Sequence, residues 1–197
     1  MQKSFAGLLA LAGWFAITAQ YVLMLTNNVN TVGEASIRFF SYFTILTNIA
    51  VATYFTALLF DARITRVKGL LSAITVYIII VGLVYQVALR HIWDPQGLQK
   101  WVDELLHSFI PLGALFYWSL FEKKGPWYSQ IFAWSIYPLA YLIFTLIRGR
   151  ISGFYPYPFV NVTEIGMQQT LLNALVILAL FMALSLAFIF INRKVRK

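Results

Sequence analysis

The sequence predicts an all-α, polytopic membrane protein: one bundle of six transmembrane helices with both termini in the cytoplasm. The chain is 60% hydrophobic and only 11% charged, and its mean hydropathy is +0.75. A soluble domain is about 45–50% apolar and about 25% charged. In 197 residues this composition supplies nearly six segments of the roughly 20 residues that span a bilayer. A soluble enzyme, a disordered protein and a nucleic-acid-binding protein are thereby excluded.

Six apolar runs account for the predicted spans, and the connections between them are short, so neighbouring helices are expected to be antiparallel. No internal repeat or linker divides the chain, which predicts a single domain over residues 1–197. The first run follows a single Lys3 and lacks a small-residue cleavage site, so it is expected to be a retained helix. The predicted spans are Ser4–Leu25, Ile37–Phe60, Gly69–Leu89, Glu104–Phe121, Trp127–Ile147 and Met167–Ile191.

The charged residues predict the orientation of these spans. Cytoplasmic loops of membrane proteins collect Lys and Arg. With the N-terminus in the cytoplasm, the cytoplasmic segments hold ten basic and two acidic residues: Lys3, Arg63, Arg66, Lys68, Lys123, Lys124, Arg193, Lys194, Arg196 and Lys197 with Asp61 and Glu122. The other side holds five of each, so the whole net charge of +8 lies on one side.

Metal and cofactor chemistry has little basis in this composition, and we expect no cofactor. The chain has no cysteine and only two histidines, too few for a three-His zinc site. His91 and His107 could together hold a haem or a metal between helices, although neither has a distinctive ligand spacing. This remains a minor alternative.

The second predicted helix carries a polar stripe. Arg38, Ser41, Thr44 and Asn48 follow at intervals of three, three and four residues, which places them on one face of a helix, with Thr47 beside them. Polar groups are costly at membrane depth and therefore indicate functional sites. The alternative is that Ser41 and Asn48 only mediate contacts between helices.

The fourth predicted helix brings His107 to a depth similar to that of Thr44. A Thr hydroxyl becomes a nucleophile only beside a general base, and an imidazole is suited to that task. Asp103 and Glu104 precede His107 by four and three residues, so either could orient the ring. Alternatively, His107 is a structural residue. For Asp103 we prefer the interpretation that it complements the dipole of a helix N-terminus, whereas the role of Glu104 stays open.

The connection after the fifth helix is rich in aromatic residues and proline: Tyr155, Pro156, Tyr157, Pro158 and Phe159. It is interpreted either as a lid across the outer mouth of the bundle or as part of an aromatic belt at the membrane interface. Arg148, at the end of that helix, either stabilises negative charge in the site or reaches the lipid headgroups. Gln168, Gln169 and Asn173 open the sixth helix on the same side.

Three segments resemble a known family: RFFSYFTILTN in the second helix, HSFIPLGALFYW in the fourth, and RGRISGFYPYPFVNV after the fifth. They are similar to bacterial six-span relatives of the androgen-induced and androgen-dependent membrane proteins. Eukaryotic members of that family are intramembrane threonine hydrolases that cleave fatty acid esters of hydroxy fatty acids. The resemblance covers the chain in order and span count, although each matched motif is short.

The resemblance implies particular site residues. The catalytic Thr of the family corresponds to Thr44, and its catalytic His, which precedes a proline, to His107 with Pro111. The family's Tyr-Pro-Phe corresponds to Tyr157, Pro158 and Phe159. One departure is Glu104, which stands where the eukaryotic motif has a second His.

The leading hypothesis is therefore a lipid-ester hydrolase of the cell membrane, in a bacterium the inner membrane, with Thr44 as nucleophile and His107 as base. Its partners are a lipid or fatty-acid ester substrate and the bilayer itself. Substrate contacts are expected from seven residues: Ser41, Asn48, Glu104, Arg148, Tyr157, Pro158 and Phe159. The alternatives are a transporter or small-molecule binder using the same cavity, and a non-catalytic partner of a larger membrane complex.

Overall fold

The computed structural model describes residues 1–27, 31–122 and 126–195, and within these ranges the chain is helical and contains no strand. The longer helices are α1 (Gln2–Asn27), α3 (Phe43–Leu59), α4 (Leu70–Val84), α6 (Ile110–Phe121), α7 (Gln130–Ser152) and α8 (Val162–Val195). The shorter elements are α2 (Val32–Phe39), η1 (Arg63–Arg66), η2 (Tyr85–Leu89), α5 (Gly97–Glu104), η3 (Leu105–Phe109) and η4 (Pro158–Val160). The all-α prediction is confirmed.

Several of these helices are long and apolar enough to cross a membrane. Four qualify within the described residues: α1, α4 continued through η2, α7 and α8. A fifth is obtained if α2 and α3, which meet at an angle of 73°, form one bent span. The length and apolar composition of these helices are those expected of a membrane protein.

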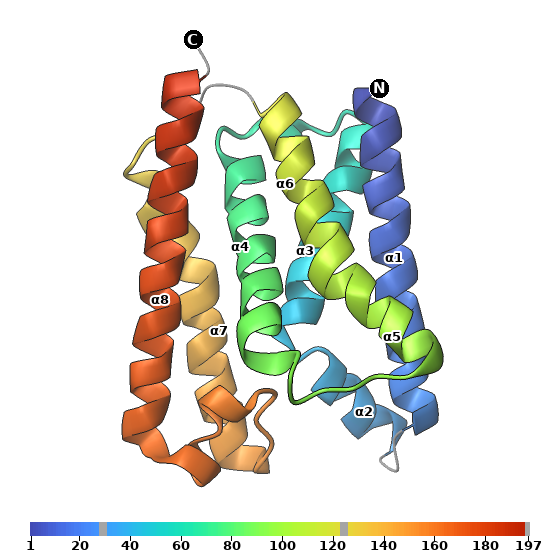
Figure 1. The fold of residues 1–197 in the computed structure, drawn as a ribbon, viewed down its shortest axis with the longest axis vertical. Coiled ribbons are helices and arrows are strands. Elements are labelled where there is room, and N and C mark those ends of the chain that lie inside the picture. Colours follow the sequence, from blue (N-terminus) through green and yellow to red (C-terminus); the bar gives the residue numbers. More distant parts are fainter. Residues whose placement is uncertain (28–30, 123–125, 196–197) are drawn as a thin grey trace.

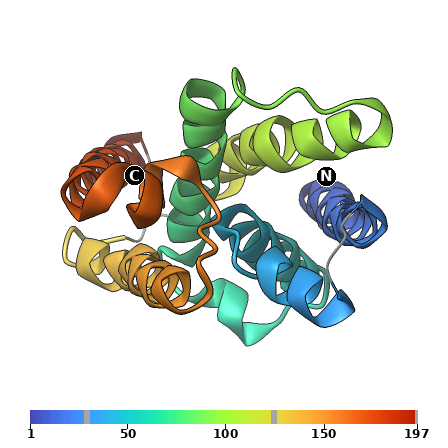
Figure 2. The ribbon, with the colours of Figure 1, turned by 90° about the horizontal axis from the view of Figure 1, so that it is seen from below.

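The helices form one bundle with α4 at its centre, in contact with α3, α6 and α8 (Figures 1 and 2). On one side α1 packs against α3 and α6, and on the other α7 packs against α8. Helix α1 begins and helix α8 ends at the same end of the bundle, here called the terminal end (Figure 1). The other end, which holds α2, α5 and η4, is called the distal end. Of the predicted cytoplasmic cations, Lys123, Lys124, Arg196 and Lys197 lie outside the described residues.

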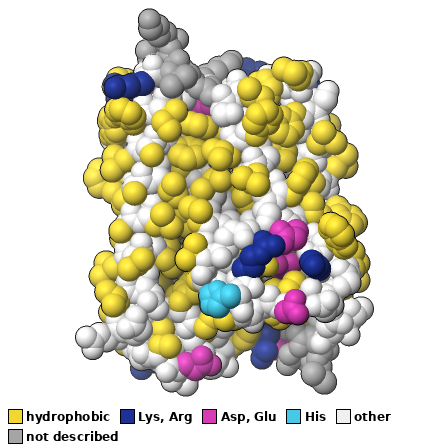
Figure 3. Space-filling view, viewed as in Figure 1, with side chains coloured by type: hydrophobic (Ala, Val, Ile, Leu, Met, Phe, Trp, Pro, Cys, Tyr) yellow, Lys and Arg dark blue, Asp and Glu magenta, His cyan; other side chains and the backbone are white. Residues whose placement is uncertain are grey.

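The distribution of apolar side chains suits a lipid environment. The buried core includes Leu9, Val51, Phe55 and Ile78, each at most 1% exposed. Large apolar side chains also cover the outside, and Figure 3 shows them over much of one face, where a cluster of basic and acidic groups lies just below the middle and a few more lie near the two ends. An exposed apolar surface of this extent is expected where lipid replaces water as the solvent.

The prediction of one helix over Ile37–Phe60 is wrong at its beginning. The chain leaves the helix after Phe39, turns through Phe40–Tyr42 and starts α3 at Phe43. Neither Pro nor Gly marks this break; tertiary contacts hold it instead. The Tyr141 hydroxyl donates a hydrogen bond of 2.8 Å to the carbonyl of Ser41, and the Tyr42 ring packs edge-on against Phe154 and Tyr157. The predicted stripe from Arg38 to Asn48 is therefore split between two helices.

Other predicted boundaries shift at the distal end. The fourth run begins at Gly97, seven residues before the predicted Glu104, and continues through α5, η3 and α6. The last helix begins at Val162 and is interrupted at Gly166, whose φ of 78° lies in the left-handed region that glycine adopts readily. Both η2 and η3 are π-helical turns, in which the backbone bonds skip one residue more than in an α-helix.

Candidate active site

The break before α3 places Thr44 in the first turn of a helix. This position lies at the positive end of the helix dipole, which favours negative charge nearby, and the next two backbone N–H groups, of Ile45 and Leu46, donate to the carbonyl of Tyr42. Thr44 is buried, with 8% of its surface exposed. Its backbone N–H donates to the Tyr157 hydroxyl oxygen at 3.1 Å, and its Oγ1 lies 3.2 Å from the same hydroxyl. The candidate nucleophile thus lies at the N-terminal end of α3 beside the Tyr157 hydroxyl.

His107 reaches Thr44 from the facing helix. Its Nε2 lies 3.4 Å from Thr44 Oγ1, and its Nδ1 lies 2.9 Å from the backbone carbonyl oxygen of Asp103. A carbonyl only accepts hydrogen bonds, so Nδ1 carries the proton of the neutral ring and Nε2 presents its lone pair to Thr44. This is the tautomer that a general base for the Thr44 hydroxyl requires.

Asp103 is the acid that accompanies His107. Its carboxylate Oδ1 lies 3.3 Å from Nδ1, and both side chains are about nine-tenths buried, with 8% and 11% of their surfaces exposed. A buried carboxylate beside Nδ1, the ring nitrogen that faces away from Thr44, stabilises the imidazolium that forms when Nε2 takes a proton. Backbone carbonyl and carboxylate together hold the ring in one orientation.

Glu104 lies in a different environment. Its carboxylate forms an ion pair with Arg90 and accepts a hydrogen bond of 2.6 Å from Ser108. It lines neither of the two cavities described below. Of the two acids considered as partners of His107, the structure therefore brings Asp103 to the ring and places Glu104 in a separate polar network.

The two π-helical turns meet at His107. The Tyr85 ring, in η2, stacks on the imidazole in η3 with centroids 4.1 Å apart and planes 15° from parallel. One turn earlier, a Cβ on Gly82 would lie only 3.0 Å from the carbonyl oxygen of His107. Glycine there allows α4 to approach η3 closely enough for the rings to stack. Short π-helical segments are frequent at functional sites.

The connection between α7 and α8 folds back over the site. Arg148 Nη1 donates to the carbonyl of Phe154 at 3.3 Å, and Tyr155 packs on Gly149 so closely that a Cβ there would lie 2.0 Å from its ring. Tyr157 then reaches Thr44. Burial raises the pKa of Tyr157 to about 12, so its hydroxyl stays protonated and can donate a hydrogen bond. Of the two interpretations of this segment, the geometry favours the lid.

Asn48 supports both sides of the site. Its amide Nδ2 donates to the carbonyl of Thr44 at 2.9 Å and to that of Leu106 at 3.3 Å, and the residue is fully buried. It therefore ties the first turn of α3 to the π-helical turn that contains His107. It lines neither cavity, so its position is that of a residue that fixes the distance between Thr44 and His107.

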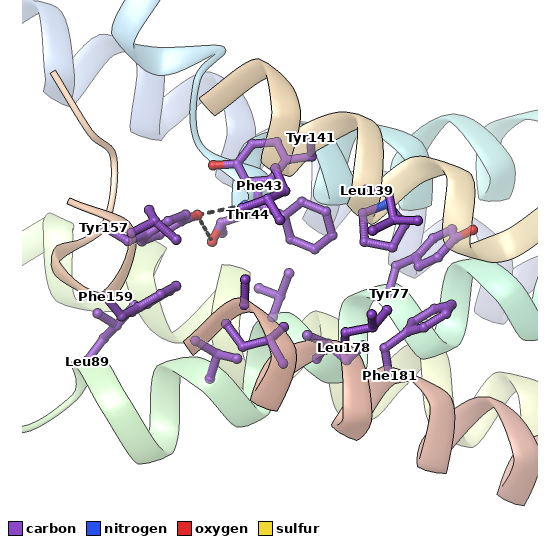
Figure 4. A pocket seen from close by; sticks show the side chains of 18 residues that line it. Phe43, Thr44, Tyr77, Leu89, Leu139, Tyr141, Tyr157, Phe159, Leu178 and Phe181 are labelled. Atoms are coloured by element: carbon purple, nitrogen blue, oxygen red, sulfur yellow. Dashed lines mark hydrogen bonds between the residues drawn. The ribbon is translucent and has the colours of Figure 1, made fainter. Parts of the chain in front are cut away.

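An apolar cavity of about 110 Å³ opens on one side of Thr44. Side chains of α4, α7 and α8 form its walls, among them Val81, Leu142 and Leu178. Figure 4 shows Thr44 and Tyr157 toward one end of it and Tyr77 and Phe181 toward the other. Its lining is hydrocarbon and aromatic apart from the hydroxyls of Thr44 and its tyrosines.

A wider cavity of about 660 Å³, here called the vestibule, lies on the other side of Thr44. His107 and Asp103 line the vestibule and not the apolar cavity, whereas Thr44, Leu89 and Tyr157 line both. Other polar residues of its wall are Gln20, Asn27, Asp94, Gln96 and Gln99. Thr44 therefore stands at the junction of an apolar and a more polar compartment.

The remaining predicted site residues are distributed around this junction. Pro158 lines the vestibule and Phe159 the apolar cavity. Ser41 donates from its hydroxyl to the carbonyl of Ile37 at 2.6 Å, and Arg148 lies 3.7 Å from Glu34 and over the Phe154 ring; both are outside the two cavities.

The residues considered as metal or haem ligands do not gather. His91 is exposed and lines neither cavity, while His107 is engaged with Asp103 and Thr44. Within the described ranges no group of three or more His, Cys, Asp or Glu side chains is placed to hold a metal ion.

Comparison with known proteins adds no relative: no protein-family model, no curated protein and no solved structure matches the chain. The chemistry of the site therefore rests on its geometry.

The contacts of Asp103 and of Tyr157 with the Thr44–His107 pair are the features that sequence reasoning missed or left open. The i, i+4 spacing of Asp103 and His107 was a sequence signal for the contact between them. The contact of Tyr157 with Thr44 depends on how the loop between α7 and α8 folds, which the sequence does not indicate.

Proposed function

We propose that the protein is a membrane-embedded lipid-ester hydrolase with Thr44 as nucleophile and His107 as general base. The observation that carries the proposal is the series of contacts from Asp103 through His107 to Thr44, with the tautomer of His107 fixed by a carbonyl. A base held beside a hydroxyl and oriented by a third group is the general arrangement of nucleophilic catalysis.

In the first half of the proposed reaction, Thr44 Oγ1 attacks the carbonyl carbon of the ester while its proton passes to Nε2 of His107. The carbonyl oxygen becomes an oxyanion, stabilised by the Tyr157 hydroxyl and by the positive end of the α3 dipole. The bond between the carbonyl carbon and the alkoxy oxygen then breaks. His107 gives its proton to that oxygen, and the alcohol leaves an acyl group on Thr44.

In the second half, a water molecule attacks the acyl carbon and gives one proton to His107. The bond from the acyl carbon to Thr44 Oγ1 breaks, the proton returns to Oγ1, and a carboxylic acid is released. One ester and one water thus give one alcohol and one acid, and both side chains are restored. No group beyond those of the chain and water is required.

The proposal includes the membrane arrangement. In it the run from α5 to α6 forms a sixth span, the basic terminal end faces the cytoplasm, and the distal end faces the outer leaflet of the cell membrane, the inner membrane in a bacterium. It also includes kinship with the androgen-induced and androgen-dependent membrane proteins, supported by the three sequence landmarks given above.

The test uses purified protein in detergent with a fluorophosphonate probe, which reacts with activated hydroxyl nucleophiles. We expect the wild type to be labelled, the labelling rate of Thr44→Ala to be lower by at least about 10³-fold, and Thr44→Ser to keep much of the wild-type labelling rate. Thr47→Ala is the matched control, because Thr47 is a buried threonine one turn further along α3, bonded to Tyr137 at 3.0 Å. Equal labelling of Thr44→Ala and wild type would contradict the proposal.

A non-catalytic binder is the second candidate, favoured by the size of the vestibule. It predicts a well-folded wild type that hydrolyses no ester and takes no label. Thr44→Ala would then alter ligand affinity only, which separates the two candidates.

A further inference from the structure

The position of Thr44 between two unlike cavities indicates how an ester would be oriented. An ester extends in two directions from its carbonyl carbon, as an acyl chain and as an alcohol. Thr44 faces both cavities, so its position alone allows two orientations of the ester: the acyl chain in the apolar cavity and the alcohol in the vestibule, or the reverse. The position of the base decides between the two orientations.

His107 must protonate the departing alkoxy oxygen, since it receives the proton of the Thr44 hydroxyl. It lines only the vestibule. The alcohol therefore leaves through the vestibule, and the acyl chain occupies the apolar cavity among α4, α7 and α8. The hydrocarbon walls of that cavity, with Leu178 and Phe181 from α8, match an acyl chain in chemical character.

The charge of the vestibule restricts the alcohol. Its described wall contains two carboxylates, Asp94 and Asp103, and no Lys or Arg. The lining also includes the amides of Gln20, Gln96 and Gln99, of which Gln99 donates to Gln20 at 2.7 Å; amide groups can both donate hydrogen bonds to hydroxyl groups and accept them. A carboxylate or phosphate on the leaving alcohol would meet like charges, whereas a neutral polyol would find hydrogen-bond partners.

We propose that the substrate is an ester of a fatty acid with a neutral, polar alcohol such as glycerol, its acyl chain in the apolar cavity and its alcohol in the vestibule. This inference rests on the proposed hydrolase function and makes it specific. It differs from the substrate class that the family resemblance implies, because the leaving group of a fatty acid ester of a hydroxy fatty acid carries a free carboxylate.

The first experiment compares two esters with the same palmitoyl chain, 1-monopalmitoylglycerol and the palmitate ester of a hydroxy fatty acid. We expect kcat/KM to be higher for the glycerol ester by about tenfold or more. Asp94→Lys, in an exposed connection, should narrow this ratio by raising the rate on the anionic ester. Glu164→Lys makes the same charge change on an exposed residue outside both cavities and should leave the ratio as it is.

The second experiment tests the acyl side with monoacylglycerols of 4, 8, 12 and 16 carbons. Leu178→Trp fills the apolar cavity and should shift the preference toward the shorter chains. Leu175→Trp is the matched control: it changes the same residue type on α8, at a position that is 61% exposed and lines neither cavity. An unchanged chain-length profile in Leu178→Trp would overturn the assignment of the acyl chain.

A third measurement does not depend on turnover. Palmitic acid with a photoreactive diazirine near the end of its chain should crosslink to α4, α7 or α8 in Thr44→Ala protein, and Leu178→Trp should reduce this crosslinking. Crosslinks on vestibule residues instead would overturn the proposed orientation. If the wild type shows no labelling and no ester hydrolysis that depend on Thr44, the proposed hydrolase function itself is refuted. If hydrolysis depends on Thr44 but the anionic ester is the better substrate, only this inference is refuted.

Discussion

At the terminal end of the bundle, α1, α3 and α6 pack as regular helices around a cluster of aromatic rings, whereas at the distal end the helices that approach Thr44 depart from regular geometry. In the terminal cluster, Phe55 contacts Tyr117 with ring centroids 4.8 Å apart, and Tyr117 contacts Phe5 and Phe121. At the distal end, α3 follows a sharp break, and η2 and η3 are both π-helical.

This difference separates stability from function within one fold. Regular helices satisfy their own backbone hydrogen bonds, which matters most in lipid. Irregular turns leave carbonyl and N–H groups for side chains, and the distal end uses them: Asp103 O accepts from His107, and Thr44 N–H donates to Tyr157. We therefore expect substitutions at the distal end to act on rate and those at the terminal end to act on folding.

The largest effect expected in this comparison is that of His107→Gln. The glutamine side chain keeps polarity but has no basic nitrogen, so the activity against esters should fall by about 10²–10⁴-fold. The thermal midpoint should change little, because the neighbouring contacts of Asn48 and Tyr157 with Thr44 remain. Hydrolysis rates and melting curves of the same preparation give both values. An unchanged rate would remove His107 from the mechanism.

Tyr157→Phe should have the next largest effect. It deletes the hydroxyl 3.2 Å from Thr44 Oγ1 and keeps the ring that stacks on Phe159 with planes 7° apart. If that hydroxyl stabilises the oxyanion, kcat should fall by about 10²-fold while KM changes little. A change in KM alone would assign Tyr157 to substrate binding.

Gly149→Ala tests the position of the loop without touching any catalytic group. The new methyl group would collide with the Tyr155 ring, so the loop must shift and carry Tyr157 with it. Activity should fall by about tenfold or more, since small displacements of positioned groups are costly in rate. Gly33→Ala is the matched control in α2, where a Cβ meets no atom within 4 Å. Equal activity of the two variants would show that Tyr155 does not anchor the lid.

Phe55→Ala should have the smallest effect on activity per folded molecule. The ring is fully buried at the terminal end, and truncating a buried Phe destabilises a protein by about 3–5 kcal/mol. We expect a lower thermal midpoint and a normal hydrolysis rate below it. A rate that falls in the still-folded protein would mean that the two ends are coupled.

The sequence predicted the helical class and located the apolar runs, because hydrophobicity over 20 residues is set by composition alone. It placed Thr44 and His107 at similar depths, which follows from topology and the rise of a helix. The break before Phe43 was missed because it depends on Tyr42 and Tyr141, whose partners are far away in the chain.

The acid beside His107 illustrates a second limit. Asp103 and Glu104 are neighbours near the start of the predicted fourth helix, and periodicity places both near one face. Because η3 is π-helical, each residue turns through a smaller angle than in an α-helix, and the face toward His107 shifts. The i, i+4 spacing of Asp103 and His107 was available in the sequence, but such a turn has no sequence signature here, so the structure was needed to choose Asp103 over Glu104.

The most direct test of the central claim is to find which atom forms the covalent bond. Wild-type protein labelled with a fluorophosphonate, digested and analysed by tandem mass spectrometry, should carry the adduct on Thr44. An adduct on Ser41 or Thr47, or on any residue outside the two cavities, would contradict the assignment of Thr44 as the nucleophile.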